Sequence, residues 1–154
     1  MKRIPKVYLE TTVFNYFFDR DRDGHLETLE LFDAIKRGEF DACTSIATTD
    51  ELEDAPDPKR TDMFDLIKDY NIKVLEKDKQ VDSLSELYLT NNAIPRSHPV
   101  DATHIAMANH YQADYLATFN FKHINKSKTK QITDTINSRL GLPGAKIVSP
   151  GELL

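Results

Sequence analysis

The sequence predicts an α/β protein in which a parallel sheet is flanked by helices. Short apolar segments of strand length alternate along the whole chain with longer segments of helical spacing. This alternation is typical of a parallel sheet that is covered by helices on both faces. The 154 residues contain no internal repeat, low-complexity tract or linker, so we expect residues 1–154 to form a single domain with a sizeable core.

Five segments have the composition of strands. The first, Lys6–Leu9, is rich in β-branched and aromatic residues and ends at Glu10. The other expected strands are the apolar segments 40–45, 72–75, 115–117 and 146–148. Because helical segments separate these strands, we expect them to run parallel.

The segments between the strands predict helices. In 25–36, the residues Leu26, Leu29, Phe32 and Ile35 share one side of a helix, and Gly38 ends it. A helix running through 13–18 is expected to be capped by Thr11 and Thr12. Further helices are predicted at 46–54, 62–69 and 78–89, from Pro99 to about residue 113, and over part of 124–139.

The stretch 97–122 contains the most informative polar positions. Pro99 suits the first position of a helix, and Asp101 then lies in its first turn, where a carboxylate meets the positive end of the helix dipole. Asn120 follows the strand 115–117. Both places border the crevice where ligands bind in open α/β sheets. Taken alone, an acid in a first helical turn is more often only a favourable cap.

The composition excludes several classes of function. A net charge of −5 and a pI near 5.5 argue against broad electrostatic binding to nucleic acid or to anionic membranes. A nucleic-acid substrate remains compatible with this charge, because a local basic strip or bound cations can offset local acidic groups. The lone Cys43 rules out an internal disulfide and suits a core position. No apolar run reaches membrane-spanning length, so we expect a soluble, cytoplasmic protein without a membrane partner.

Three carboxylates occupy positions that favour a metal site. Glu10 follows the first strand, Glu51 lies in the helix after the second, and Asp101 begins the helix before the fourth. Oxygen ligands without paired cysteines favour Mg²⁺ or Mn²⁺ over Zn²⁺. Asp101 can join the other two only if its helix crosses the carboxyl ends of the strands.

Several motifs in this order resemble those of the PIN-domain ribonucleases, which include the VapC-type toxins of bacterial toxin–antitoxin modules. The two specific motifs are PVDATHIAMA at 99–108 and DYLATFNFKHI at 114–124, and the segments 7–13, 45–52 and 147–150 are also similar. The resemblance covers essentially the whole chain. It implies a PIN-like three-layer α/β/α fold and a Mg²⁺- or Mn²⁺-dependent endoribonuclease that hydrolyses RNA phosphodiester bonds.

The resemblance also assigns residue roles. Glu10, Glu51 and Asp101 would be the first three catalytic acids and metal ligands, and Asn120 would occupy the fourth acidic position. The family usually has Asp at the first position and often at the fourth. Glu10 is one methylene longer, and Asn120 keeps an oxygen but loses a charge, so one metal ion would be held firmly and a second weakly. Asp114 would be a turn residue at the wrong end of its strand.

We expect RNA contacts close to this site. Thr11 and Thr12 could orient the first acid or a water molecule. Lys122 and Lys126 belong to a lysine-rich segment that could contact an RNA backbone, although a charge run is usually a solvated face. His123 could contact phosphate, although packing is the more common role. The implied partners are an antitoxin protein and a second copy of the chain.

Other interpretations remain open. The altered acid set is also compatible with a non-catalytic PIN-like module that binds RNA or protein. A receiver-type phosphotransfer domain fits less well, because its acidic pair after the first strand is replaced by the lone Glu10. The spacing of His98, Asp101 and His104 could suggest a transition-metal site, but His98 is expected to precede the helix and no fourth ligand is evident.

Overall fold

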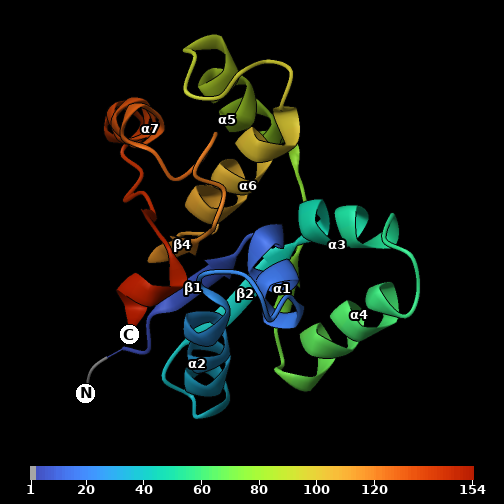
Figure 1. Cartoon of the computed structure of the whole chain (residues 1–154). Helices are drawn as coiled ribbons and strands as arrows, with labels where there is room; N and C mark the ends of the chain where they lie inside the picture. The colour runs from blue at the N-terminus through green and yellow to red at the C-terminus, as the bar shows by residue number, and fades with distance from the viewer. Residues whose placement is uncertain (1–2) are drawn as a thin grey trace.

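The computed structural model describes residues 3–154 and has a five-stranded parallel sheet at its centre (Figure 1). The strand order is β3-β2-β1-β4-β5, and every neighbouring pair is parallel. The strands are β1 (Lys6–Leu9), β2 (Asp41–Ser45), β3 (Lys73–Leu75), β4 (Tyr115–Ala117) and β5 (Lys146–Val148). The predicted sheet is confirmed, and the two strands expected at 40–45 and 72–75 each begin one residue later.

Helices occupy the segments between the strands. They are α1 (Thr11–Phe18), α2 (His25–Lys36), α3 (Ile46–Glu53), α4 (Lys59–Asp69), α5 (Lys79–Thr90), α6 (Pro99–His110) and α7 (Ser127–Leu140), with a final 3₁₀ helix η1 (Pro150–Leu153). One predicted start was wrong, because α4 begins three residues earlier than expected, directly after Pro58. The helix predicted over part of 124–139 is confirmed, and α7 begins at Ser127 because the N–H groups of Ile124 and Asn125 donate to the Asn120 carbonyl in a turn.

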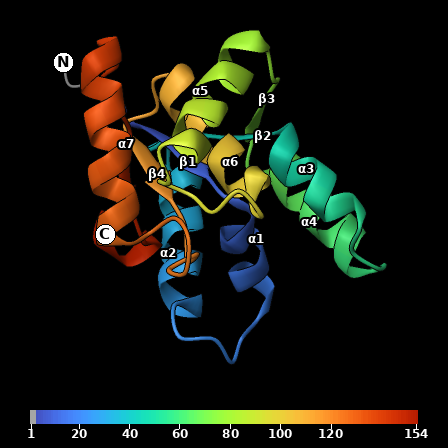
Figure 2. The same cartoon turned by 90° about the horizontal axis from the view of Figure 1, so that it is seen from above.

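Side chains of β1 alternate between two cores. Val7 and Leu9 belong to a core that is completed by α1, α2 and α4 on one face of the sheet. Tyr8 belongs to the other core, which is formed with α5, α6 and α7. Figures 1 and 2 show these helix groups on opposite sides of the sheet. The predicted three-layer α/β/α arrangement is therefore confirmed.

The structure bears on two expectations from the sequence, namely that Cys43 is a core residue and that no segment is long and apolar enough to span a membrane. Cys43 is buried in the core on the Tyr8 side, and this burial raises the pKa of its thiol to about 12. A thiol with such a pKa is unreactive at neutral pH. Among residues 3–154, each helix is too short or too polar to cross a membrane.

The order of the strands creates a switch point between β1 and β4. From β1 the chain moves outward to β2 and β3, then crosses back to β4 and β5 on the other side. Leu9 and Ala117 are in register at the carboxyl ends of β1 and β4, and the Glu10 N–H donates to the Ala117 carbonyl at 3.1 Å. Residues that follow these two ends therefore border the position where open α/β sheets bind ligands.

Candidate functional site

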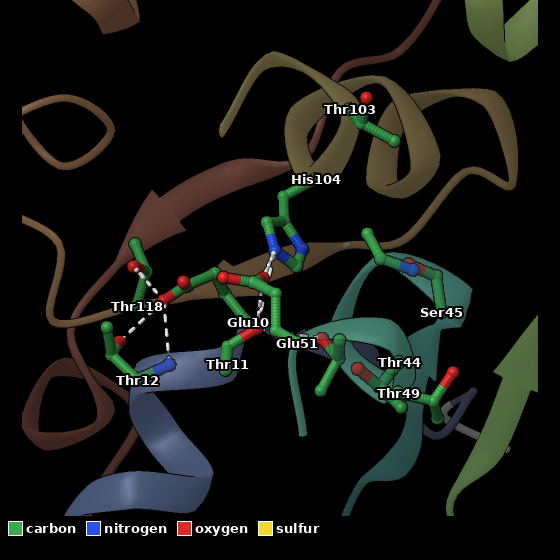
Figure 3. Close-up of polar contacts among 12 residues, drawn as sticks. Glu10, Thr11, Thr12, Thr44, Ser45, Thr49, Glu51, Thr103, His104 and Thr118 are labelled. Atoms are coloured by element: carbon green, nitrogen blue, oxygen red, sulfur yellow. Dashed lines mark hydrogen bonds and ion pairs between the residues drawn. The ribbon is translucent and has the colours of Figure 1, made fainter. Parts of the chain in front are cut away.

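Glu10 sits at the switch point as the N-cap of α1. Its Oε1 accepts hydrogen bonds from the Thr12 N–H at 3.2 Å, the Thr12 hydroxyl at 2.5 Å and the Thr118 hydroxyl at 2.7 Å (Figure 3). The prediction that Thr11 and Thr12 cap this helix was wrong, because the longer Glu10 side chain folds back and takes the capping position. Glu10 is only 3% exposed, so its carboxylate is held in one orientation.

Glu51 approaches the same edge from α3. The Ser45 side chain caps the start of α3, and Leu52 is buried in the core, which leaves the neighbouring Glu51 at the edge of the sheet. Its Oε1 accepts hydrogen bonds from the Thr11 hydroxyl at 2.7 Å and from His104 Nε2 at 2.8 Å. Partial burial opposes ionisation, but the hydrogen bond and charge of His104 and the Thr11 hydroxyl outweigh it, so the pKa of Glu51 is lowered.

His104 holds Glu51 from inside the protein. The residue is fully buried on α6. Because an ionised carboxylate can only accept, Nε2 carries the hydrogen that Glu51 receives. The other nitrogen, Nδ1, lies 2.8 Å from the Tyr8 hydroxyl, which is in turn 2.7 Å from the Ser45 hydroxyl. The imidazole is therefore fixed at both nitrogens.

Three acids act on the pKa of this imidazole. Burial alone would lower the pKa of His104, but the hydrogen bond to Glu51 and the negative charges of Glu10, Glu51 and Asp101 raise it above its ordinary value. Glu10 is the N-cap of α1, Glu51 lies in α3 and Asp101 lies in α6. Of the three, Glu51 is the acid that hydrogen-bonds to the ring, and Figure 3 shows Glu10 and Glu51 on the same side of His104.

Asp101 reaches the edge because α6 begins there. Its Oδ2 lies 3.0 Å from Nδ1 of His123, in the loop that follows the carboxyl end of β4. The side chains of Asp101 and His123 are only 17% and 12% exposed. The first turn of α6 therefore lies beside the loop at the carboxyl end of β4.

Asn120 belongs to the same hydrogen-bond network. Its N–H donates to the Thr118 hydroxyl at 2.9 Å, and its Oδ1 accepts from the His123 N–H at 3.0 Å. Thr118 therefore links Asn120 to Glu10, and His123 links it to Asp101. The Asn120 Oδ1 was expected to bind metal, but it already accepts the His123 N–H. Its role as a fourth metal ligand stays a prediction.

The acids share a pattern that fits a divalent cation. In Glu10, Glu51 and Asp101, one carboxylate oxygen takes all of the side-chain hydrogen bonds. Within residues 3–154, the second oxygen of each acid has no hydrogen-bond partner. One oxygen therefore fixes each side chain while the other stays free to bind a ligand, and such oxygen donors suit Mg²⁺ or Mn²⁺.

An open groove of about 530 Å³ borders the site beside Thr12 and Asn120. Its other lining residues are Asn15, Tyr16, Asp19, Arg22, Lys59, Phe119, Phe121 and Lys122. Tyr16 stacks on Phe119 with ring centroids 3.8 Å apart, and Phe121 is 56% exposed. Lys122 therefore lies on this groove, whereas Lys126 is the N-cap of α7 and does not line it.

Two residues in the network were missed as parts of the acid site. The sequence argument considered His104 only as a metal ligand, and its contacts to Glu51 and Tyr8 depend on residues far away in the chain. Thr118 was not singled out from the sequence. Its position directly after a buried strand was the available signal, because β1 and β4 are neighbours and their ends meet.

A comparison with protein-family models matches residues 7–128 to the PIN domain. The chain belongs to the PIN-domain family. Two solved structures of similar fold are VapBC2 from Rickettsia felis bound to a promoter DNA fragment and DNA-bound VapBC from Salmonella typhimurium. Each match has a TM-score of 0.59 and 15% identity, and they cover 94% and 95% of this chain and 98% of each matched chain. No curated protein sequence matches the chain.

Family membership agrees with the fold and with the sequence resemblance. The matched residues 7–128 include Glu10, Glu51, Asp101 and Asn120. At 15% identity the two solved structures support the architecture alone. What this PIN domain does must therefore be argued from its own site.

Proposed function

We propose that this PIN domain is a divalent-metal-dependent endoribonuclease and the toxin of a toxin–antitoxin pair. The proposal rests on the hydrogen bonds that join Glu10 to Asp101 through Thr118, Asn120 and His123 at the switch point of the sheet, with Glu51 held beside them by His104. Each acid is fixed through one oxygen and has the other free of hydrogen bonds among the described residues. This arrangement is one that a cation-binding hydrolytic site needs.

Glu10, Glu51 and Asp101 would hold Mg²⁺ or Mn²⁺, with Asn120 as a weaker fourth ligand. When bound, such an ion supplies a nucleophilic water and stabilises the charge that develops on the phosphate oxygens. Thr12 and Thr118 keep the Glu10 carboxylate in position, while Thr11 and His104 do so for Glu51. A carboxylate that is already oriented loses little further freedom when it binds a ligand.

The groove beside Asn120 would hold the RNA strand. Arg22, Lys59 and Lys122 supply positive charge for phosphates, and the exposed ring of Phe121 offers a surface on which a base can stack. This combination suits a single-stranded segment, whose bases are free to leave their own stack. Lys126 and His123 would contact RNA outside this groove, because neither residue lines it.

The antitoxin partner is proposed from the two similar folds. Both come from VapBC assemblies that are bound to DNA. By extension, we place this chain in the cytoplasm with an antitoxin protein as its partner, and a homodimer as the assembly that the antitoxin meets. Co-purification from a co-expressed neighbouring reading frame, followed by mass measurement of the complex, would test this part separately.

One observation favours a second candidate, a PIN module that binds RNA without cleaving it. Asn120 lacks the charge of an acid, and its Oδ1 already accepts the His123 N–H. A site with only three acids would bind a cation less tightly. Metal affinity separates the two candidates, because a module without catalytic activity should bind Mn²⁺ poorly and should show no RNA cleavage when Mn²⁺ is added.

The test is cleavage of one unstructured and one structured RNA by the purified full chain, with Mn²⁺, with Mg²⁺ and with a chelator. Glu51→Gln and Asp101→Asn should each lower metal-dependent cleavage about 100-fold or more, because a ligand of the cation that stabilises the developing charge is lost. Glu53→Gln is the matched control, since Glu53 is an exposed acid on the same helix. Thermal unfolding of each variant checks that the fold is kept.

Two results would count against the nuclease. Cleavage that persists in the chelator, or in both acid variants, would contradict the site assignment. RNA binding without cleavage, together with failure to bind Mn²⁺, would favour the binding module instead.

A further inference from the structure

A second set of metal-binding side chains lies beside the acids. His98, Asp101 and His123 each present one donor atom, and these three atoms all lie within 4.8 Å of one another. Within residues 3–154, no other group of three histidine, cysteine or acidic side chains is so close. We name this set the His-Asp-His cluster.

The cluster is assembled from two segments far apart in sequence. His98 is the N-cap residue of α6 and Asp101 lies in its first turn, whereas His123 belongs to the loop after β4. Nδ1 of His123 is 3.0 Å from Oδ2 of Asp101, and the His98 and His123 rings have centroids 4.0 Å apart. The sequence argument grouped His98 and Asp101 with His104, but the fold turns His104 inward and brings His123 to them instead.

The backbone around each ligand is fixed. The His98 N–H donates to the Pro95 carbonyl at 2.9 Å. The His123 N–H donates to Asn120, and its carbonyl accepts the Thr129 hydroxyl at 2.8 Å. An ordered backbone keeps the two imidazoles near Asp101 without a bound ion, which lowers the entropy lost when an ion binds.

We propose that the His-Asp-His cluster is a binding site for a transition-metal ion of the Zn²⁺ and Co²⁺ type. Two imidazoles and one carboxylate form a three-ligand set that leaves coordination positions for water. Imidazole nitrogens favour these ions, whereas Mg²⁺ prefers oxygen ligands and keeps much of its water. The cluster therefore differs in metal preference from the oxygen-only site of Glu10 and Glu51.

Asp101 is common to both sites. An ion in the cluster would engage a carboxylate that the proposed nuclease site also uses, so the two sites should influence each other's affinity. The metal preference of the cluster is a separate property, because it depends on His98 and His123 and does not require RNA cleavage.

The ordinary alternative is that Asp101 and His123 only form an ion pair that fastens the loop to α6. That pairing accounts for the 3.0 Å contact. If the ion pair were the only role of these residues, removing His98 would not change the affinity for Co²⁺, because His98 is not part of the pair. Removing His98 therefore separates a metal site from a structural contact.

The experiment is titration of the untagged, metal-free full chain with Co²⁺, followed by visible absorption and by calorimetry. We expect one strong Co²⁺ site that Zn²⁺ empties and that millimolar Mg²⁺ does not. His98→Ala and His123→Ala should each weaken Co²⁺ binding by about 10-fold or more. His110→Ala is the matched control, because His110 is at the other end of α6 and pairs with Asp78.

The Glu51→Gln variant separates Co²⁺ binding by the cluster from RNA cleavage by the proposed nuclease site. That variant should lose RNA cleavage but retain the strong Co²⁺ site, since Glu51 is not in the cluster. Unchanged Co²⁺ affinity in both His98→Ala and His123→Ala, or no strong Co²⁺ site in the wild-type chain, would overturn the proposal.

Discussion

His104 shows how one buried side chain can organise a polar site. It has no exposed surface and connects the Glu51 carboxylate to the Tyr8 hydroxyl. Buried polar groups of this kind are costly when they lose a partner. Its contribution is therefore both to the stability of the fold and to the position of an acid.

Replacing His104 with leucine tests this role, because the two side chains have similar volume and leucine makes no hydrogen bond. We expect His104→Leu to lower the free energy of unfolding by about 2 kcal/mol, since the Tyr8 hydroxyl and Glu51 each lose a partner. His110→Leu serves as the control. His110 is partly exposed and pairs with Asp78 at the surface, so its loss should cost less than about 1 kcal/mol. Urea unfolding of both variants measures the difference, and equal losses would contradict the account.

The sequence indicated which acids were candidates for the site, but it did not indicate which residues contact them. Glu10, Glu51 and Asp101 stood out because each lies next to a recognisable element boundary. The partnership of His104 with Tyr8 spans 96 positions in the chain, and it depends on how α6 packs against the sheet. Spacing along one helix cannot indicate such a contact.

At the scale of elements, the loop before α2 supports the loop that carries Asn120. Gly24 has a φ of +102°, and a Cβ there would lie 2.6 Å from Cε1 of Phe119. Phe119 cannot easily move, because its ring stacks on Tyr16. The ring in turn borders the groove beside Asn120, so a change at Gly24 should reach the site through Phe119.

Gly24→Ala should therefore destabilise the protein more than Gly38→Ala. Both glycines have positive φ, so alanine is strained at each by about 1 kcal/mol. Only Gly24 has a close neighbour, since a Cβ at Gly38 meets no atom within 4 Å, and the extra crowding should add about 1–3 kcal/mol. Thermal unfolding of the two variants compares them directly. A loss at Gly24 no greater than that at Gly38 would show that Phe119 adapts freely.

The opposite edge of the sheet depends on Asp114, before β4. Its carboxylate accepts hydrogen bonds from Arg3 and from the Lys6 N–H at 2.7 Å, which ties the start of β1 to β4. The Arg3 hydrogen bond is the main cause that lowers the pKa of Asp114, and the Lys6 N–H adds to it. The structure thus confirms Asp114 as a turn residue, remote from the acids.

This lowered pKa gives a pH dependence with a definite sign. A carboxyl whose pKa falls on folding adds stability above its unfolded pKa of about 3.9, and that stability is lost as the pH falls through the folded value. At pH 7 we expect Asp114→Asn to cost about 1 kcal/mol, because Arg3 is largely exposed and its share is screened. The gap between wild type and variant should close below about pH 4 in acid unfolding series. A gap that stays constant down to pH 2 would contradict this assignment.

The boundaries of helices and strands could be predicted where they depend on the residues of the segment itself. β1, β4 and β5 have the bounds that their composition indicated, and α6 begins at Pro99 as expected. The start of α1 was different because Glu10, rather than a threonine, supplies the cap. α7 begins only at Ser127 because the Asn120 carbonyl accepts the N–H groups of Ile124 and Asn125 in a turn. At α1 the side chain of a site residue competes with the local propensity of the segment, and before α7 the backbone of a site residue does so.

At the scale of the whole molecule, a net charge of −5 limits how the protein can hold RNA. Three basic side chains line the groove beside Asn120, namely Arg22, Lys59 and Lys122. A negative net charge gives no general attraction for phosphate. Binding should therefore come from this local groove, and its salt dependence should be shallow.

If three phosphates are contacted, the logarithm of the RNA binding constant should fall with the logarithm of salt concentration with a slope of about −2. Fluorescence anisotropy of a labelled single-stranded RNA measures this slope, with Glu51→Gln protein used to prevent cleavage. A slope steeper than about −5 would indicate a much larger basic surface. A slope of zero would indicate that phosphates are not contacted.

The parallel topology could be predicted from the alternation of segments, because this alternation admits few other arrangements. The strand order was not predicted, and it is the strand order that makes β1 and β4 neighbours and unites Glu10, Thr118 and Asn120. The contact of Glu10 with the loop after β4 is therefore a property of the whole fold. Sequence position made Glu10 and Asn120 candidates, and topology brings both to Thr118.

The central claim is that Glu10, Glu51 and Asp101 bind a divalent cation through their free oxygens. The most direct measurement is crystallographic, using the anomalous signal of Mn²⁺ in crystals of the full chain grown with millimolar Mn²⁺. The account predicts an anomalous peak within about 2.0–2.5 Å of carboxylate oxygens from at least two of these acids. A well-ordered site without a peak between them, or a peak only at His98 and His123, would contradict it.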